Sequence, residues 1–201
     1  MGSTVIVDEK ETGTLEYMMS NPISRFEFIL GRLTGMAVAT SAVVLLGYGL
    51  AAFLAYNANY SGYGEVAITI VIALALNATM LGIAMTVSTL SRRKATALGV
   101  AIFIWFLFTA LSNVEYLSIV TTLISGPWIA MIFVLLNPIQ IATLLVPGIT
   151  GQDLSQQGSV GFLMAHLFHE SAWIVLTVAM VIWLVFFLAL TVFLFTRQDL
   201  A

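Results

Sequence analysis

Four long stretches of the chain are apolar and carry no charged residue and no histidine. These stretches are Leu33–Tyr56, Val66–Leu90, Ala95–Leu111 and Ala172–Thr196. A membrane-spanning helix needs about 20 mostly apolar residues, and the third stretch, which is the shortest, can extend past Ser112 toward Tyr116. Backbone polar groups in lipid must be satisfied within the segment itself. The pattern therefore predicts an all-α integral membrane protein with about four transmembrane helices.

The region Tyr116–Thr150 carries no charged residue and is interrupted at two dipeptides that end in proline. Gly126-Pro127 interrupts its apolar run and Asn137-Pro138 ends it, because a residue before proline is pushed out of helical geometry. The two pieces, Leu117–Ser125 and Trp128–Leu136, are each too short to cross a bilayer. We predict that they form re-entrant half-helices on the external side, and two full crossings are the alternative.

The chain after these pieces is predicted to stay at the membrane surface. An interfacial helix is expected over Ile139–Val146, and Pro147-Gly148 is expected to open a polar external loop at Gly151–Gly158. Asn77 lies near the middle of the second span, and an amide at that depth is expected to bond to a neighbouring helix.

The amino-terminal residues have a different pattern. Residues 8–20 are predicted to form a short helix, with acidic residues in its first turn and with Leu15, Met18 and Met19 on one face. Ser24-Arg25-Phe26-Glu27 fits a capping box that starts a second helix. This region can be an interfacial anchor, or it can be a docking element with an apolar tip and acidic residues at its rim. The pattern does not choose between the two.

The charges of the chain set its class and its orientation. Hydrophobic residues make up 60% of the sequence and charged residues 8%, against about 25% charged in soluble domains, so the chain is read as a membrane protein and nucleic acid is not an expected partner. With four crossings, all seven Lys and Arg residues lie on the side of residues 1–32. Basic residues favour the cytoplasmic side. We expect both termini in the cytoplasm and the chain in the cell membrane.

The sequence lacks the groups that convert energy. The four spans hold no ionisable side chain for a proton relay, and no Gly-x-x-x-x-Gly-Lys-Ser/Thr loop is present to bind ATP. If the chain transports a substrate, the energy comes from another polypeptide. His166, His169 and Glu170 form a weak candidate metal site on the external side, but polar residues at a membrane boundary are the simpler interpretation, and we expect no metal and no catalytic residue.

A longer motif near the amino terminus consists of Glu9-Lys10-Glu11-Thr12-Gly13-Thr14-Leu15-Glu16-Tyr17, then Ser20-Asn21-Pro22-Ile23-Ser24-Arg25, then Glu27 and Gly31-Arg32. This motif resembles the signature of type-2 ABC transporter permeases. Within that family, the segment Gly13-Thr14-Leu15-Glu16-Tyr17 and the dipeptide Asn137-Pro138 are most similar to the permeases of nitrous-oxide-reductase maturation transporters. Family members usually carry two membrane helices before this motif. We expect that the sequence is a fragment or a split or shortened subunit, or that another chain supplies these helices.

The resemblance implies a cytoplasmic coupling helix that docks on an ATPase subunit. Carried over by position, the docking residues are Glu9, Glu11, Gly13, Thr14, Leu15, Glu16, Tyr17 and Met18. The expected partners are an ABC ATPase, which holds ATP and Mg, and a second permease chain, either identical or different. An external gate is expected at Gly126, Pro127, Asn137 and Pro138.

The chain is thus expected to have four parts. They are a coupling-helix region at 1–32, three transmembrane helices at 33–116, an external re-entrant and interfacial region at 117–170, and the last helix with a cytoplasmic tail at 171–201. The predicted function is that of a permease subunit that exports a small or lipid-like substrate by alternating access. A non-transporting scaffold subunit of a larger membrane complex is the alternative.

Overall fold

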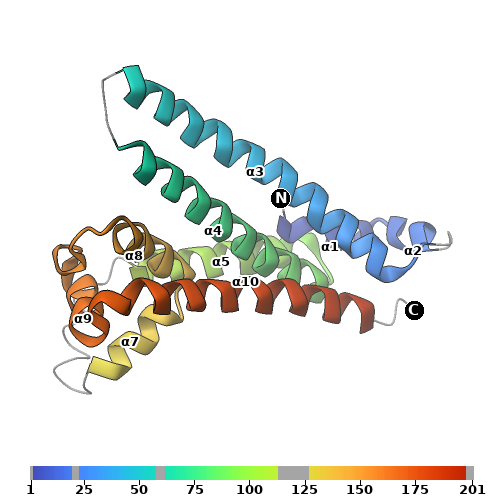
Figure 1. Ribbon diagram of the computed structural model, residues 1–201. Coiled ribbons are helices and arrows are strands. Elements are labelled where there is room, and N and C mark those ends of the chain that lie inside the picture. The colour runs from blue at the N-terminus through green and yellow to red at the C-terminus, as the bar shows by residue number, and fades with distance from the viewer. Residues whose placement is uncertain (1, 20–22, 58–61, 113–126, 198–201) are drawn as a thin grey trace. The chain divides into compact units, whose positions relative to one another are not determined.

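The computed structural model describes residues 2–19, 23–57, 62–112 and 127–197 (Figure 1), and no strand occurs in these ranges. The amino-terminal elements are η1 (Gly2–Thr4), α1 (Val5–Glu11) and α2 (Thr14–Met19), and the long helices are α3 (Arg25–Asn57), α4 (Tyr63–Leu90), α5 (Lys94–Ser112) and α10 (Ala172–Arg197). Between α5 and α10 lie α7 (Pro127–Leu135), α8 (Pro138–Thr150), η2 (Leu154–Gln156), α9 (Gly158–Phe168) and η3 (His169–Ser171).

The expected spans are confirmed as helices. Four helical segments of the described chain are long and apolar enough to cross a membrane, and they contain α3, α4, α5 and α10. The start of α3 confirms the predicted capping box. The Ser24 backbone N donates to Glu27 Oε2 at 2.9 Å, and the Glu27 backbone N donates to Ser24 Oγ at 3.2 Å. Each residue therefore satisfies a donor that the helix start leaves open.

The predicted single helix over 8–20 is wrong, because it is two helices. α1 ends at Glu11, and Gly13 adopts a φ of +71° before α2 begins at Thr14. Glycine takes this left-handed conformation at little cost and commonly ends helices. As a consequence, Glu9 and Glu11 lie in the second half of α1 and only Asp8 lies in its first turn.

The region after residue 126 agrees in part with the prediction. Leu117–Ser125 lies outside the described residues, whereas Trp128–Leu136 corresponds to α7, whose axis meets that of α8 at 100°. The predicted helix end at Pro147 is wrong, since α8 continues to Thr150. Proline removes a backbone donor but keeps its acceptor, and the Pro147 carbonyl accepts from Gly151 N and Gln152 N. The sequence also did not predict α9.

The chain forms two compact units. Unit 1 consists of Met1–Val43, Asn77–Trp105 and Leu184–Ala201, and unit 2 consists of Val44–Leu76 and Phe106–Trp183. Unit 1 contains α1, α2 and parts of the four long helices, whereas unit 2 contains α7, α8, α9 and the remaining parts.

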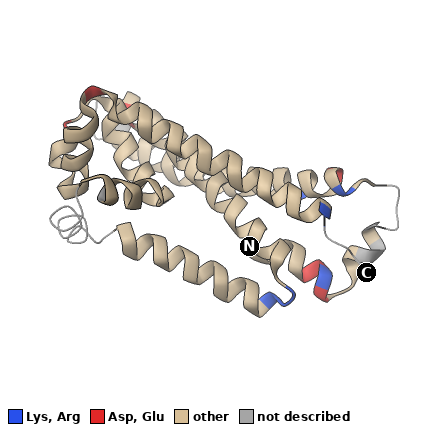
Figure 2. Ribbon diagram, turned by 90° about the horizontal axis from the view of Figure 1, so that it is seen from below, with Lys and Arg blue, Asp and Glu red and all other residues tan. Residues whose placement is uncertain are grey.

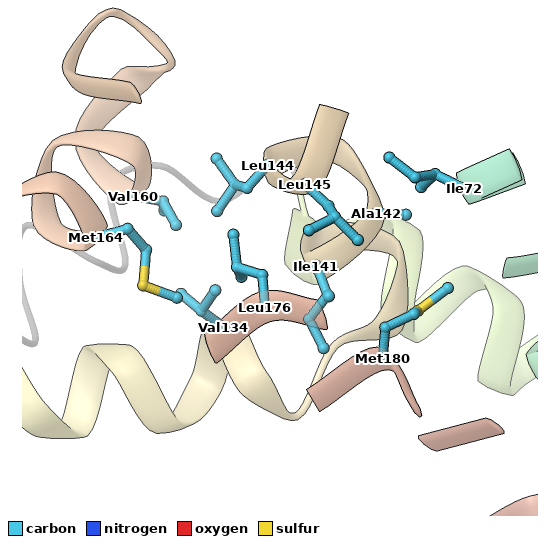
Figure 3. Packing of buried hydrophobic residues seen from close by; sticks show 10 residues of the cluster. All are labelled: Ile72, Val134, Ile141, Ala142, Leu144, Leu145, Val160, Met164, Leu176 and Met180. Atoms are coloured by element: carbon cyan, nitrogen blue, oxygen red, sulfur yellow. The ribbon is translucent and has the colours of Figure 1, made fainter. Parts of the chain in front are cut away.

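Unit 2 has an apolar core around α8. Ile141, Ala142, Leu144 and Leu145 project from α8 toward side chains of its neighbours (Figure 3). The neighbours are Ile72 of α4, Val134 of α7, Val160 and Met164 of α9, and Leu176 and Met180 of α10. One face of α8 is therefore buried, which explains why a 13-residue helix that is too short to span is retained.

Unit 1 has its own core, and it includes the amino-terminal helices. Its buried members are Ile6, Leu15, Ile29, Leu33, Leu81, Met85 and Phe195. Asn77 Nδ2 donates to Thr40 Oγ1 at 2.9 Å, which confirms the expected bond between α4 and α3. α4 also approaches α10 closely at Gly82, where an added Cβ would lie 3.1 Å from Phe187 Cβ.

Candidate functional site

The amino-terminal helices present one exposed turn. Glu11, Thr12, Gly13 and Thr14 are all exposed, and they connect α1 with α2. The Thr12 and Thr14 hydroxyls lie 2.9 Å apart within hydrogen-bond distance, and Thr12 Oγ1 also donates to the Asp8 carbonyl at 2.8 Å. The turn is thus held by its own hydroxyl groups and its positive-φ glycine rather than by contacts with other helices. We refer to Thr12–Thr14 as the exposed turn.

The start of α1 is capped by a residue that is distant in sequence. The cap position, Thr4, makes no side-chain cap bond, and instead Ser88 Oγ of α4 accepts from Ile6 N at 3.0 Å and from Val7 N at 3.1 Å. The first N–H groups of a helix have no partner within it. Because Ser88 is fully buried, α1 is attached to α4 by two backbone bonds that water does not replace.

Four consecutive residues, Asp8–Glu11, which we call the charged segment, contact three different long helices. Glu9 forms an ion pair with Arg32 of α3. Asp8 Oδ1 lies 2.8 Å from Lys94 Nζ of α5, and Glu11 Oε2 accepts from the Lys94 backbone N at 3.1 Å. The Glu11 carboxylate thus lies at the start of α5. A carboxylate is favourable there because the first N–H groups of a helix carry partial positive charge.

Lys10 completes the charged segment. Its Nζ donates to the Thr89 carbonyl near the end of α4 at 2.5 Å, where a cation is favourable. Burial lowers the pKa of Lys10, because removal from water disfavours the charged form. Glu9 is also well shielded, with 12% of its side chain exposed, and its second oxygen, Oε2, is buried without a hydrogen-bond partner among the described residues.

The predicted docking residues are therefore of different kinds. Gly13 and Thr14 are exposed, and Glu11 is exposed although its carboxylate accepts from the Lys94 backbone N. Glu9 is engaged within the chain, and Met18 is half-buried. Leu15 is 2% exposed and lies in the core of unit 1 with Ile6 and Ile29. The side chains of Glu16 and Tyr17 lie outside the part that the structure describes.

Sequence reasoning missed the contacts of the charged segment. Periodicity places Asp8, Glu9 and Lys10 on a helix, but it does not identify partners 23 to 86 positions away. One signal was present: a short acidic run near the start, with basic residues at the ends of all four predicted spans. All seven Lys and Arg residues belong to unit 1 (Figure 2).

The predicted gate residues organise the junction of α7 and α8. Asn137, which is 2% exposed, accepts from Ile139 N at 3.0 Å and caps α8. Its Nδ2 donates to the Phe108 carbonyl at 2.9 Å and to Ser112 Oγ at 3.0 Å, both at the end of α5. Pro127 and Pro138 are the first residues of α7 and α8, where proline is well tolerated. Gly126 lies outside the described residues.

The structure does not support the candidate metal site at His166, His169 and Glu170. Among the described residues, no group of three or more His, Cys, Asp or Glu side chains could hold a metal ion, so His166, His169 and Glu170 do not form one. His166 stacks on Phe162 at 6.2 Å between ring centroids. His169 has a φ of +49° where α9 ends.

The comparisons with known proteins concern almost the whole chain. Residues 1–200 match the family described as ABC-2 family transporter protein. The chain is 28% identical over 211 residues to a protein of Pseudomonas aeruginosa named "Probable ABC transporter permease protein NosY", covering 97% of this chain and 72% of that protein. A protein of the same name from Stutzerimonas stutzeri is 28% identical over 155 residues, covering 70% of this chain and 53% of the relative.

These matches agree with the resemblance in the amino-terminal motif, and the family implies a transmembrane subunit that pairs with an ATPase. The apolar helices independently identify a multi-pass membrane protein. The chain belongs to the ABC-2 family of ABC transporter permeases.

Proposed function

We propose that the exposed turn docks on the ATPase subunit and that the charged segment transmits the movement of this subunit to the membrane helices. The observation that carries the proposal is the contact pattern of α1. Asp8–Glu11 contact α3, α4 and α5 through charged groups, while the adjoining turn is left exposed. A force on the turn would therefore reach three helices within one helical turn of its point of application.

The burial of Leu15 assigns it a supporting role in this proposal. Leu15 and Ile6 pack in the core of unit 1 against Ile29 of α3, so they fix the position of α1 and α2 on the helices. The ATPase would be contacted by Glu11, Gly13 and Thr14. The docking residues that the family resemblance implies thus divide into an exposed set (Glu11, Gly13 and Thr14) and a buried residue, Leu15, that packs within the chain.

We propose further that the permease exports a small or lipid-like substrate by alternating access, with ATP and Mg bound on the partner. The four spans carry no ionisable group within their apolar stretches, and ion-coupled carriers usually need such groups at depth. The basic residues of unit 1 support a cytoplasmic position for this unit and for both termini. A second permease chain and an outer gate at α7 and α8 belong to the same proposal.

The docking step is tested by adding charge to the exposed turn. Thr14→Arg places a long cation beside Gly13 and is expected to abolish co-purification of the ATPase from detergent-solubilised membranes. Gln152→Arg adds the same charge at an exposed position of unit 2 and should leave co-purification intact. If Thr14→Arg retains the ATPase in full, the turn is not the docking site. If the unsubstituted chain retains no ATPase, the scaffold alternative is favoured.

The transmission step is tested with a variant that keeps the turn unchanged. The double substitution Glu9→Gln and Arg32→Gln removes the ion pair between α1 and α3 without leaving one charge alone. We expect the ATPase to remain bound while its hydrolysis becomes independent of the permease in reconstituted vesicles. Unchanged dependence of hydrolysis on the permease would show that this ion pair transmits nothing.

A further inference from the structure

Unit 1 contains an apolar groove between α3, α4 and α10, which we call the unit 1 groove. Its volume is about 890 Å³, which is within the range of pockets that hold ligands. Its walls include Phe26, Leu30 and Ala37 of α3, Leu81 of α4, and Leu188 and Phe193 of α10. A membrane helix surface that is merely exposed to lipid is convex, whereas this surface is hollowed.

The walls of the groove offer no polar group to an occupant. The lining contains two hydroxyl groups, those of Thr34 and Thr196. Thr34 Oγ1 donates to the Leu30 carbonyl at 2.8 Å, and Thr196 Oγ1 donates to the Val192 carbonyl at 3.0 Å. Both hydroxyls are therefore satisfied within their own helices. An occupant with polar groups along its length would lose hydrogen bonds here, so the groove fits a hydrocarbon chain.

One end of the groove carries two guanidinium groups. Arg25 Nη1 lies 3.4 Å from the Thr196 carbonyl, and Phe26 and Thr196 both line the groove. The guanidinium of Arg197 lies over the Phe193 ring, with its Cζ 4.3 Å from the ring centroid. Glu27, the neighbouring acid, is bonded to Ser24 Oγ at 2.7 Å. Arginine binds phosphate oxygens in a bidentate manner, so this end fits an anionic phosphate group.

The length of the groove distinguishes a lipid from a transmembrane helix of another chain. The α3 residues that line it, from Phe26 to Ala37, cover about three helical turns, or roughly 16 Å. The α10 residues from Val185 to Thr196 cover the same distance. One leaflet contributes roughly 15 Å of hydrocarbon, whereas a spanning helix would need a groove of about twice this length.

We propose that the unit 1 groove binds a phospholipid with an anionic headgroup, taken from the leaflet on the side of the basic residues. Its acyl chains would lie along α3 and α10, and its phosphate would be held by Arg25 and Arg197. Basic pockets between membrane helices are known to select anionic lipids. The lipid site does not require that the chain transports a substrate or binds an ATPase.

Photocrosslinking in lipid nanodiscs tests the proposal. The purified full chain is placed in phosphatidylcholine nanodiscs that contain a trace of phosphatidylglycerol with a diazirine on one acyl chain, or the matching phosphatidylcholine probe. The phosphatidylglycerol probe is expected to label the peptides of α3 and α10 that line the groove, in excess over the phosphatidylcholine probe. Arg25→Gln with Arg197→Gln should reduce this labelling about fivefold for each charge removed.

Two matched controls separate the groove from general effects of charge and bulk. Arg92→Gln with Arg93→Gln removes two charges from the turn between α4 and α5 and should leave labelling unchanged. Ala189→Phe fills the groove and should reduce labelling by both probes. Val38→Phe adds the same ring at a position that is 71% exposed and should leave labelling by both probes unchanged.

Three outcomes would overturn the proposal. The first is equal labelling by both probes that the Arg25 and Arg197 substitutions do not change. The second is crosslinking of the groove residues to another polypeptide instead of lipid, with a photoreactive residue at Leu188 in the complex extracted from native membranes. The third is unchanged labelling with Ala189→Phe. If the double Gln variant does not fold, Arg25→Lys with Arg197→Lys keeps the charge and should retain the preference for phosphatidylglycerol.

Discussion

The two units differ in how their small helices are held. In unit 2, α8 is held by apolar side chains that interlock with four other helices, as Figure 3 shows. In unit 1, α1 has apolar contacts as well, but it is also attached by single charged or hydroxyl groups to α3, α4 and α5. Apolar packing is insensitive to salt, whereas exposed ion pairs are screened by it. Among the contacts of α1, the half-exposed ion pair of Asp8 with Lys94 is therefore the one that salt should weaken most.

The distribution of charge shows the same difference. Unit 1 holds all seven basic residues, and unit 2 holds none. Buried polar groups in unit 2 act within the helix framework: Asn137 caps α8, and Trp183 Nε1 donates to the Leu135 carbonyl at the end of α7 at 2.9 Å. In unit 1, polar groups instead connect an amino-terminal element to the long helices.

The largest expected effect is in the core of unit 2. Leu176 is fully buried against α8 and α9, so Leu176→Ala leaves a cavity and is expected to lower the free energy of unfolding by about 3 kcal/mol. Thermal unfolding in detergent, followed by circular dichroism, measures this. Ile182→Ala on the same helix removes a side chain that is 61% exposed and should cost far less. Equal losses for both would show that the core of unit 2 is not packed as described.

Ser88→Ala tests the attachment of α1 to α4. The substitution leaves the Ile6 and Val7 N–H groups without their acceptor, and unsatisfied buried groups cost roughly 1–3 kcal/mol. We expect faster amide hydrogen exchange confined to α1 and α2, with α7 to α9 unchanged. Thr34→Ala removes a hydroxyl that bonds only to carbonyls of its own helix and serves as the control. Slower or unchanged exchange in α1 would mean that Ser88 is not its cap.

The elements of both units were largely predictable from sequence, but the contacts of α1 were not. The four spans follow from apolar length, and the capping box at Ser24 follows from local chemistry. Leu15 illustrates the limit: an apolar residue on an amphipathic helix is compatible with a partner's groove or with the chain's own core, and periodicity does not distinguish them. Gly13 was a missed local signal, since a glycine after Lys-Glu-Thr is typical of a helix end.

The errors in unit 2 have a similar origin. Pro147 was expected to end α8, but the helix ends at Gly151, whose φ is +75°. α9 was not predicted because its residues, Gly158–Phe168, adjoin a polar loop and contain His166, which was interpreted as a candidate metal ligand. Local sequence rules predict where a helix can stop. Pro147 and Gly151 both fit such a rule, and only Gly151 ends α8.

The ion pair between Asp8 and Lys94 is expected to have a smaller effect. Both side chains are nearly half exposed, at 48% and 46%, and such pairs contribute about 0.2–1 kcal/mol. A double-mutant cycle with Asp8→Asn and Lys94→Gln, measured by thermal unfolding, should give a coupling energy in this range. The coupling should decrease as salt is added. A coupling that is larger and independent of salt would contradict the proposed difference between the units.

The smallest expected effect concerns Asp153, which caps η2 in unit 2. Hydrogen bonds from Ser155, first from its side chain and then from its backbone N, lower the pKa of Asp153 below its usual value of 3.8. A carboxyl whose pKa is lowered by folding stabilises the fold above its unfolded pKa, and this contribution is lost as pH falls through the folded pKa. Asp153→Asn should therefore lower the free energy of unfolding slightly at neutral pH and leave it nearly unchanged below the folded pKa, so that the acid side of the stability curve becomes flatter. Because Asp153 is fully exposed, this change in the free energy of unfolding should be smaller than that of any substitution in α1. A loss of stability at neutral pH larger than that of Asp8→Asn would mean that unit 2 also depends on charge.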